Sequence, residues 1–179
     1  MNVFARLLKQ KPIAPLAAAL VFSMLAFGGC TRHKHIVVES GKAEDYYCSF
    51  YEDGTVEITA YTGSAEELKL PNRIGEYDVV GFGVKAFDGC VGLKRVYIPP
   101  TVTSLPSKLF NACPDLEAVY FSESVKTVGK NAVFECPSFK TVLFGGSAEE
   151  WDGVFIGTVP WTDNYEIVNS EIVFDYVLN

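Results

Sequence analysis

The residues of this 179-residue chain that could do chemistry are few, and most of them are cysteines. Five cysteines occur, and His33 and His35 are the only histidines. Thiols can form disulfides, bind soft metals or act as nucleophiles. However, no histidine follows residue 35, which excludes a Ser-His-Asp or Cys-His catalytic set from the rest of the chain. We therefore expect no enzyme, no cofactor and no metal site.

Three of the cysteines, Cys90, Cys113 and Cys136, recur at an interval of 23 residues. No CxxC pair or histidine cluster accompanies them, so their spacing does not indicate a zinc site. We interpret them as a structural core column, because free cysteine is among the most buried residue types. A single disulfide within the column is the alternative, since equivalent positions in successive turns lie within disulfide reach. Cys48 stands apart, and we expect it in the core.

The interval of 23 residues extends to the apolar residues around the cysteines. Counting the cysteines, seven apolar columns share it, including Leu93, Leu116 and Phe139, and Val96, Val119 and Val142. A fixed period of this size indicates stacked supersecondary units that bury their apolar faces on one another. We therefore predict a β-rich α+β repeat solenoid, with repeats at about 66–92, 93–115, 116–138 and 139–160.

Four strand-like segments recur in register, at residues 68–70, 93–98, 116–121 and 139–144. Each is followed by Pro, Ser or Gly, which turn the chain. The segments between them, such as Lys85–Cys90 and Lys108–Cys113, are too short for a long helix, and we expect a short helix or 3₁₀ turn there. The first turn carries about five extra residues, which we place in a loop over Asn72–Tyr77.

The two ends of the array differ from its middle. Alternating residues on both sides of Asp53-Gly54 predict a β-hairpin over Tyr46–Tyr61, which would cap the open end of the stack. Ser147 and Glu150 form a capping-box pattern, and a helix is expected to extend from there through Phe155. Residues 161–179 break the repeat and are predicted to form a C-terminal cap, with strand alternation in Glu171–Val177.

The N-terminus has the composition of a signal peptide. A basic start precedes Ile13–Phe27, an uncharged run of about 15 apolar residues, which is shorter than the roughly 20 that a spanning helix needs. Phe27-Gly28-Gly29-Cys30 resembles the lipobox of bacterial lipoproteins. The resemblance implies cleavage between Gly29 and Cys30 and lipidation of Cys30. An ordinary secretory signal and an uncleaved anchor helix are the alternatives.

These features divide the chain into a lipoprotein signal peptide (1–29), a polar tether (30–44) and a repeat domain (45–179). His33 and His35 fall in the tether. Removing residues 1–29 removes three basic and no acidic residues, so the net charge changes from −7 to −10. This balance argues against nucleic acid as a partner, because such binding needs clustered Lys and Arg. It suits a domain displayed at a surface.

The repeat itself resembles a known family. An aromatic-small-Cys turn followed by Leu-Lys-x-Val-x-Ile-Pro, as in residues 84–99 (VKAFDGCVGLKRVYIP), is similar to the BspA-type leucine-rich repeats of bacterial surface proteins. The resemblance covers about residues 50–160, with Val133 in place of the usual Phe. It implies a right-handed solenoid with a parallel sheet on one side. It also implies display outside the cytoplasm and adhesion or protein binding, and it implies no catalytic activity.

Strand alternation predicts which side chains of the sheet point outward. Val96 and Ile98 point inward, so their neighbours point outward. By the same register we predict a candidate binding face that consists of Lys69, Arg95, Tyr97, Tyr120 and Leu143. Exposed tyrosines supply large, rigid contact area. The alternative is a cross-strand ladder that only stabilises the sheet.

Together these observations predict a lipid-anchored, extracytoplasmic leucine-rich repeat protein. It would bind a protein or cell-surface macromolecule, or mediate adhesion, through its sheet face. The membrane partner would be the bacterial cell membrane or outer membrane, reached through the lipid anchor, and we expect the protein to be monomeric. An accessory or structural envelope lipoprotein without an adhesive role is the alternative.

Overall fold

The computed structural model of the chain describes residues 37–157 and 164–178. The predicted signal peptide, its cleavage between Gly29 and Cys30, the lipidation of Cys30 and the first part of the tether lie outside these residues. So do the two histidines and the start of the predicted C-terminal cap.

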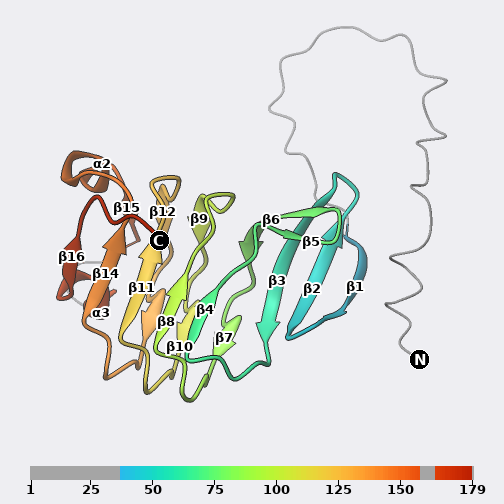
Figure 1. Ribbon diagram of the computed structural model, residues 1–179, viewed down its shortest axis with the longest axis horizontal. Helices are drawn as coiled ribbons and strands as arrows, with labels where there is room; N and C mark the ends of the chain where they lie inside the picture. The colour runs from blue at the N-terminus through green and yellow to red at the C-terminus, as the bar shows by residue number, and fades with distance from the viewer. Residues whose placement is uncertain (1–36, 158–163, 179) are drawn as a thin grey trace, which may run out of the picture. The chain divides into compact units, whose positions relative to one another are not determined.

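The two middle turns of the repeated region each pass through three parallel sheets (Figure 1). The largest, which we call the main sheet, has five strands. In chain order they are β4 (Glu67–Lys69), β8 (Arg95–Tyr97), β11 (Ala118–Phe121), β14 (Thr141–Phe144) and β16 (Glu171–Val173). The predicted strand in each repeat is therefore confirmed, although β8, β11 and β14 are shorter than their predicted segments and β4 begins one residue earlier.

Between strands of the main sheet, the chain adds two-residue strands to two smaller sheets. The second sheet consists of β9 (Ser104–Leu105), β12 (Thr127–Val128) and β15 (Phe155–Ile156). The third sheet consists of β7 (Phe87–Asp88), β10 (Phe110–Asn111) and β13 (Val133–Phe134). All of these pairings are parallel. The turn is thus three-sided, and the apolar columns fill its interior.

In the middle of the array, neighbouring strands pair residues that stand 23 positions apart in the sequence. Val119 pairs with Val96 on one side and with Val142 on the other, and all three side chains are buried. In the third sheet, Phe110 pairs with Phe87 in the same way, and their rings stack with centroids 5.1 Å apart. The predicted period and its buried columns are therefore confirmed. Burying each such apolar side chain contributes about 1.5–3 kcal/mol to stability.

The segment Lys85–Cys90 contains the two-residue strand β7, and our prediction of a short helix or 3₁₀ turn there is wrong. Left-handed backbone at Lys85 and Gly89 stands on both sides of β7 and prevents helical hydrogen bonding. The N–H of Phe87 donates to Leu109 O at 3.0 Å, and that of Gly89 donates to Asn111 O at 2.8 Å. The same correction applies to Lys108–Cys113, which contains β10. The backbone bonds of these segments run to the next turn.

The N-terminal region forms a five-stranded sheet of its own, in the order β1-β2-β3-β6-β5. The predicted hairpin is present as β2 (Tyr46–Tyr51) and β3 (Thr55–Tyr61), which pair antiparallel. The prediction of a tether is wrong for residues 37–43, because β1 (Val37–Ala43) pairs antiparallel with β2. The mostly polar residues of this stretch did not indicate a strand. β1 is held in the sheet mainly by its backbone hydrogen bonds to β2.

A second correction concerns the extra residues of the first turn. The predicted loop over Asn72–Tyr77 is instead an antiparallel hairpin of β5 (Arg73–Ile74) and β6 (Tyr77–Phe82). β6 also pairs in parallel with β3, and the N–H of Tyr61 donates to Ala86 O at 2.8 Å. The N-terminal sheet is therefore hydrogen-bonded directly to the first turn of the array.

At the other end of the array, α2 (Ala148–Asp152) begins with the predicted capping box of Ser147 and Glu150. The helix does not extend through Phe155, as we predicted, because Phe155 belongs to β15 and its N–H donates to Lys126 O. α3 (Tyr165–Val168) and β16 follow. β16 pairs with β14 and ends at Val173, earlier than the alternation in Glu171–Val177 indicates.

Candidate interaction surface

The predicted outer column of the main sheet is in register in the structure. Lys69 pairs with Tyr97, Tyr97 with Tyr120, and Tyr120 with Leu143. The rings of Tyr97 and Tyr120 lie 6.2 Å apart at their centroids, in a tilted arrangement. These residues therefore form one column along the main sheet.

The two tyrosines are nevertheless covered, so our prediction that they are exposed is wrong. Tyr97 is 8% exposed and Tyr120 is 7% exposed. Lys69 Nζ lies over the Tyr97 ring, 5.8 Å from its centroid, and the ring of Tyr176 lies 5.9 Å from that of Tyr120. Burial raises the pKa of both phenols. Alternation predicts the direction of a side chain but not what lies over it.

Tyr176 is the residue of this surface that sequence reasoning missed. Its N–H donates to Phe144 O at 3.0 Å, and the N–H of Asp175 donates to Gly146 O at 2.9 Å. These bonds tie the C-terminal segment to the end of β14, where the Tyr176 ring reaches Tyr120. The only sequence signal was the alternation of residues 171–177, which we interpreted as a longer strand.

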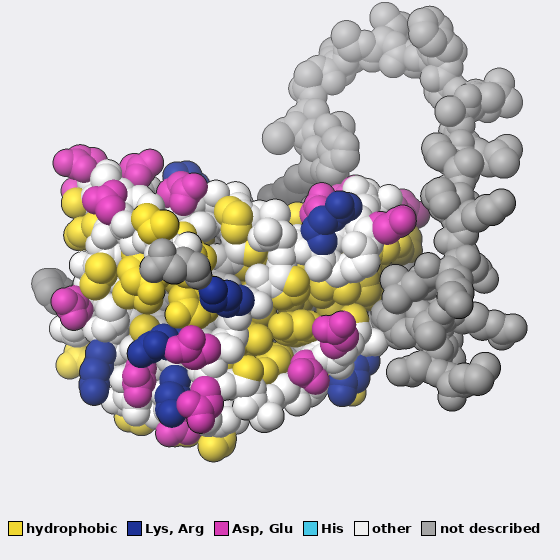
Figure 2. Space-filling view, in the orientation of Figure 1, with side chains coloured by type: hydrophobic (Ala, Val, Ile, Leu, Met, Phe, Trp, Pro, Cys, Tyr) yellow, Lys and Arg dark blue, Asp and Glu magenta, His cyan; other side chains and the backbone are white. Residues whose placement is uncertain are grey.

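Charged side chains gather on the main sheet near the starts of its strands. Figure 2 shows basic and acidic groups side by side there, below an apolar area. Lys94 Nζ lies 2.8 Å from a carboxylate oxygen of Glu66, and Arg95 pairs with Glu67. The hydrogen bond from Lys94 lowers the pKa of Glu66, and the same bond raises the pKa of Lys94. We call these four residues the charged margin.

Of the five predicted face residues, Lys69 and Arg95 are exposed and Leu143 is half-buried. Glu117 and Lys140, which are exposed, extend the charged margin toward the later strands. The N–H of Glu117 donates to Lys94 O at 2.8 Å, and that of Lys140 donates to Glu117 O at 2.9 Å. The accessible part of this surface is therefore mainly charged, and it lies beside a covered aromatic column.

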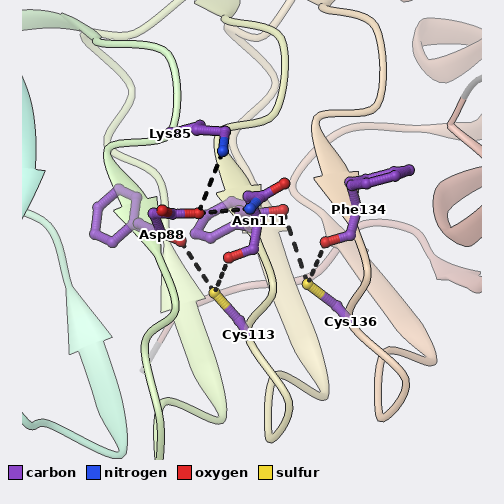
Figure 3. Close-up of polar contacts among 8 residues, drawn as sticks. Lys85, Asp88, Asn111, Cys113, Phe134 and Cys136 are labelled. Atoms are coloured by element: carbon purple, nitrogen blue, oxygen red, sulfur yellow. Dashed lines mark hydrogen bonds and ion pairs between the residues drawn. The ribbon is translucent and has the colours of Figure 1, made fainter.

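A second polar group lies on the third sheet (Figure 3). The Asn111 side-chain amide donates to Asp88 Oδ1, and Lys85 Nζ lies 3.9 Å from the same oxygen. Lys108 Nζ lies 4.5 Å from the centroid of the Phe134 ring. The sequence did not indicate this group. Asp88, Asn111 and Phe134 occupy the same position in successive repeats, but they are three different residue types. The contacts of the group link one turn to the next.

The cysteine column lies beside this group. Cys113 and Cys136 are fully or almost fully buried, and Cys90 is half-buried. The Cys113 thiol lies 3.0 Å from Phe87 O, to which it donates, and the Cys136 thiol lies 3.4 Å from Phe134 O (Figure 3). Cys48 is also buried, as expected, and all four thiols are free. The core column is thus present, with its first member partly accessible.

A shallow depression of about 410 Å³ lies between the third turn and α3. It is lined by Glu135, Cys136, Pro137, Phe139, Tyr165, Glu166 and Asn169. The Glu135 N–H donates to Glu166 Oε1 at 3.1 Å, which ties the turn to the helix.

Within residues 37–157 and 164–178, no group of three or more His, Cys, Asp or Glu side chains is arranged to hold a metal ion. No helix in those ranges is both long and apolar enough to cross a membrane.

One strand of the main sheet per 23-residue turn, with apolar columns inside the turn, defines a leucine-rich repeat protein. The family described as the BspA type leucine rich repeat region (6 copies) matches residues 60–155. The chain belongs to this family, as the resemblance of residues 84–99 implied. No curated protein matches the chain significantly in sequence.

Solved structures share the fold at low sequence identity. A leucine-rich repeat protein from Bacteroides capillosus is 22% identical, with a TM-score of 0.54, and the alignment covers 66% of this chain and 99% of that one. A leucine rich cell surface protein from Faecalibacterium prausnitzii is 24% identical, with a TM-score of 0.52 and 60% of this chain covered. This chain spans only 33% of the length of the latter protein.

Proposed function

We propose that this protein is a lipid-anchored, extracytoplasmic member of its family that binds a protein or cell-surface macromolecule through its main sheet. Residues 1–29 would be removed as a signal peptide, and Cys30 would carry the lipid. The repeat domain would then stand outside the cytoplasm as a monomer, without catalytic activity. In this proposal the array is a right-handed solenoid, and the N-terminal sheet and the C-terminal segment cap its two ends.

The in-register outer surface of the main sheet is the observation that supports binding. Lys69, Arg95, Glu117 and Lys140 project from consecutive strands or from the residues just before them, and they are exposed. A hydrogen-bonded sheet holds such groups at fixed spacings, so little conformational entropy is lost when a partner binds. The burial of Tyr97 and Tyr120 supports a stabilising role for these two rings. We therefore assign the partner contacts to the charged groups around them.

The extracytoplasmic location rests on the N-terminal sequence and on the family. The order of basic residues, apolar run and Gly28-Gly29-Cys30 is that of a lipoprotein signal. Several acyl chains on one cysteine give durable anchoring, since each buried methylene contributes about 0.8 kcal/mol. The structural relative from Faecalibacterium prausnitzii is itself a cell surface protein. An accessory envelope lipoprotein has the same anchor, and its partner would be an envelope protein of the same cell.

The anchor is tested by intact mass and membrane fractionation of the native protein and of a Cys30→Ala variant. We expect the native chain to begin at Cys30, to carry added acyl mass and to fractionate with membranes. The variant should be released or mis-sorted. A native chain with an unmodified Cys30 in the soluble fraction would show that the protein is secreted without an anchor.

The binding surface is tested by reversing charge on it. A variant with Lys69→Glu and Arg95→Glu is compared with a control that carries Lys126→Glu and Lys130→Glu, which flank β12 in the second sheet. The proteins or cell-surface macromolecules that co-purify with the native protein should be lost from the first variant and retained by the control. Retention by both variants would contradict a role for the main sheet. A Tyr97→Ala and Tyr120→Ala variant is a weaker probe, because both rings are buried.

A further inference from the structure

Cys90 and Cys113 occupy equivalent positions in adjacent turns of the third sheet. Their strands pair in parallel with Phe87 opposite Phe110 and Asp88 opposite Asn111, and each cysteine stands two residues beyond the second of these pairs. The residue before each cysteine, Gly89 or Ala112, has left-handed backbone with φ of 64° and 53°. The two turns therefore remain parallel up to the cysteines.

This placement meets the distance requirement for a disulfide. Paired strands lie about 4.8 Å apart, and bridged cysteines have Cα atoms about 4.4–6.8 Å apart. The pKa of Cys90 is lowered mainly through its interaction with the Cys113 side chain, which agrees with this proximity. No large movement of the backbone is needed to join them.

The column is not symmetric in its access to solvent. Cys113 is fully buried and Cys136 is 2% exposed, whereas Cys90 is half-buried. The hydrogen bond with Cys136 lowers the pKa of Cys113, but the bond with Cys90 and burial together raise it to about 11. The hydrogen bond with Cys113 and burial also raise the pKa of Cys136. Since the thiolate is the reactive form, a reagent from solvent meets one accessible and activated thiol, that of Cys90.

We propose that Cys90 and Cys113 form a reversible disulfide by exchange with small disulfide molecules in the surrounding medium, and that Cys136 remains a thiol. This inference is independent of the lipid anchor and of the binding surface.

The reaction has two steps. The Cys90 thiolate attacks one sulfur of the small disulfide, the S–S bond breaks, and one half leaves as a thiolate while the other stays on Cys90. The Cys113 thiolate then attacks Cys90 Sγ and displaces the second half. The two protein thiols are oxidised to one disulfide, the small molecule is reduced to two thiols, and the two protons from the cysteines pass to the leaving thiolates.

The reaction changes the contacts of the third sheet. In the reduced protein the Cys113 thiol donates to Phe87 O at 3.0 Å. The disulfide has no S–H, so Phe87 O loses this donor. Cys136 keeps its own contact with Phe134 O. The exchange is therefore confined to one pair of turns.

The test uses the full chain with Cys30→Ala, so that the thiols of the repeat domain alone are counted. The protein is exposed to oxidised glutathione, the free thiols are blocked with N-ethylmaleimide after unfolding, and intact mass and peptide mapping follow. We expect two fewer blocked thiols and a cross-linked peptide that joins Cys90 to Cys113, both reversed by dithiothreitol. A cross-link between Cys113 and Cys136, or a stable glutathione adduct on Cys90, would overturn the proposal.

Three variants in the same background separate the roles. Cys90→Ala should lose the reaction, and Cys113→Ala should stop at the glutathione adduct on Cys90. Cys136→Ala should still form the cross-link, and its loss of the cross-link while still folded would contradict the proposal. Thermal unfolding of each variant shows whether it remains folded. If one does not fold, the peptide map of the parent chain decides the question.

Discussion

At the scale of single residues, the turns of this array depend on backbone conformations that side chains rarely adopt. Two columns, each with one residue per turn, have positive φ: Lys85, Lys108 and Asn131, and Gly89, Ala112 and Glu135. They stand on both sides of the two-residue strands of the third sheet. A left-handed residue other than glycine costs roughly 1 kcal/mol or more. Only Gly89 and Asn131 have residue types that favour this conformation, so composition did not predict the columns.

The pair Gly89 and Ala112 provides a test at this scale. A Cβ atom added at Gly89 would meet nothing within 4 Å, so Gly89→Ala should act through backbone strain alone. We expect it to lower the free energy of unfolding by about 1 kcal/mol. The reverse change, Ala112→Gly, removes the same strain but increases the entropy of the unfolded chain. We expect a smaller effect of opposite sign.

Urea unfolding of both variants and of the parent protein measures these changes. The slope of the free energy against urea concentration should stay the same, because neither change alters the surface exposed on unfolding. Two effects of the same sign and size would show that the left-handed conformation at these positions is not the cause.

At the scale of elements, the last turn is completed by one asparagine rather than by another strand. Asn164, which is fully buried with φ of 58°, precedes α3. Its side-chain oxygen accepts from the Ala132 N–H at 2.8 Å. Its side-chain nitrogen donates to Gly129 O at 3.1 Å and to Gly157 O at 2.8 Å. The amide thus provides partners for backbone groups that have no following turn.

We expect Asn164→Ala to lower the free energy of unfolding by about 3 kcal/mol. The change removes three side-chain hydrogen bonds and leaves buried backbone groups without these partners. It also places alanine at a positive φ. The matched control is Asn169→Ala, which removes one exposed bond to Tyr165 O and should change stability by less than about 0.5 kcal/mol.

Denaturant unfolding of the two variants decides the point. An Asn164→Ala protein as stable as the control would show that solvent or a shifted backbone replaces the amide without cost. The prediction of a cap over 161–179 did not single out Asn164. Nothing in its neighbours distinguishes it, and two of its side-chain partners, Gly129 and Ala132, lie more than 30 residues earlier.

Sequence patterns predicted the elements of the main sheet better than the others. Period and alternation together specified its strands and their register, because two buried apolar columns, such as Val96, Val119 and Val142, alternate with residues of mixed type. The strands of the second and third sheets have only two residues, which is too short for any alternation. β1 was missed for a different reason. Its sequence, VVESGKA, does not alternate between apolar and polar residues, and the partner that makes it a strand lies in β2.

At the scale of the whole molecule, the outer surface of the main sheet shows where sequence inference ends. The register of the column of Lys69, Tyr97, Tyr120 and Leu143 was predicted correctly. Their exposure was not, because Tyr97 and Tyr120 are covered by Lys69 and Tyr176 from distant parts of the chain. A regular repeat predicts its own interior, but it does not predict which non-repeated segment folds onto it.

Alkaline pH should destabilise the folded protein. Burial raises the pKa of Tyr46 and Tyr51 to about 12 and that of Cys48 to about 11. Each group binds its proton more tightly when folded, so its contribution to stability is complete below its ordinary pKa. The contribution is lost as pH rises through the folded-state pKa. We expect Tm to fall steadily between about pH 9 and 12.

The Tyr46→Phe variant measures the contribution of one hairpin residue, Tyr46, to this pH dependence. It should lose less stability than the parent between about pH 10 and 12, because one of the buried ionisable groups is gone. Thermal unfolding followed by circular dichroism at several pH values measures the difference. An identical pH profile for the two proteins would show that ionisation of Tyr46 does not contribute to the loss of stability at alkaline pH.

The equal spacing of paired residues has a consequence for how this chain can change in length. Duplicating or deleting one complete unit, such as residues 93–115, leaves every remaining residue opposite an equivalent one, and the stack grows or shrinks by about 4.8 Å. An insertion of one residue within a strand would reverse which side chains face the interior beyond that point. Whole-unit gain and loss is therefore the route by which such an array can vary in size without redesign of its core.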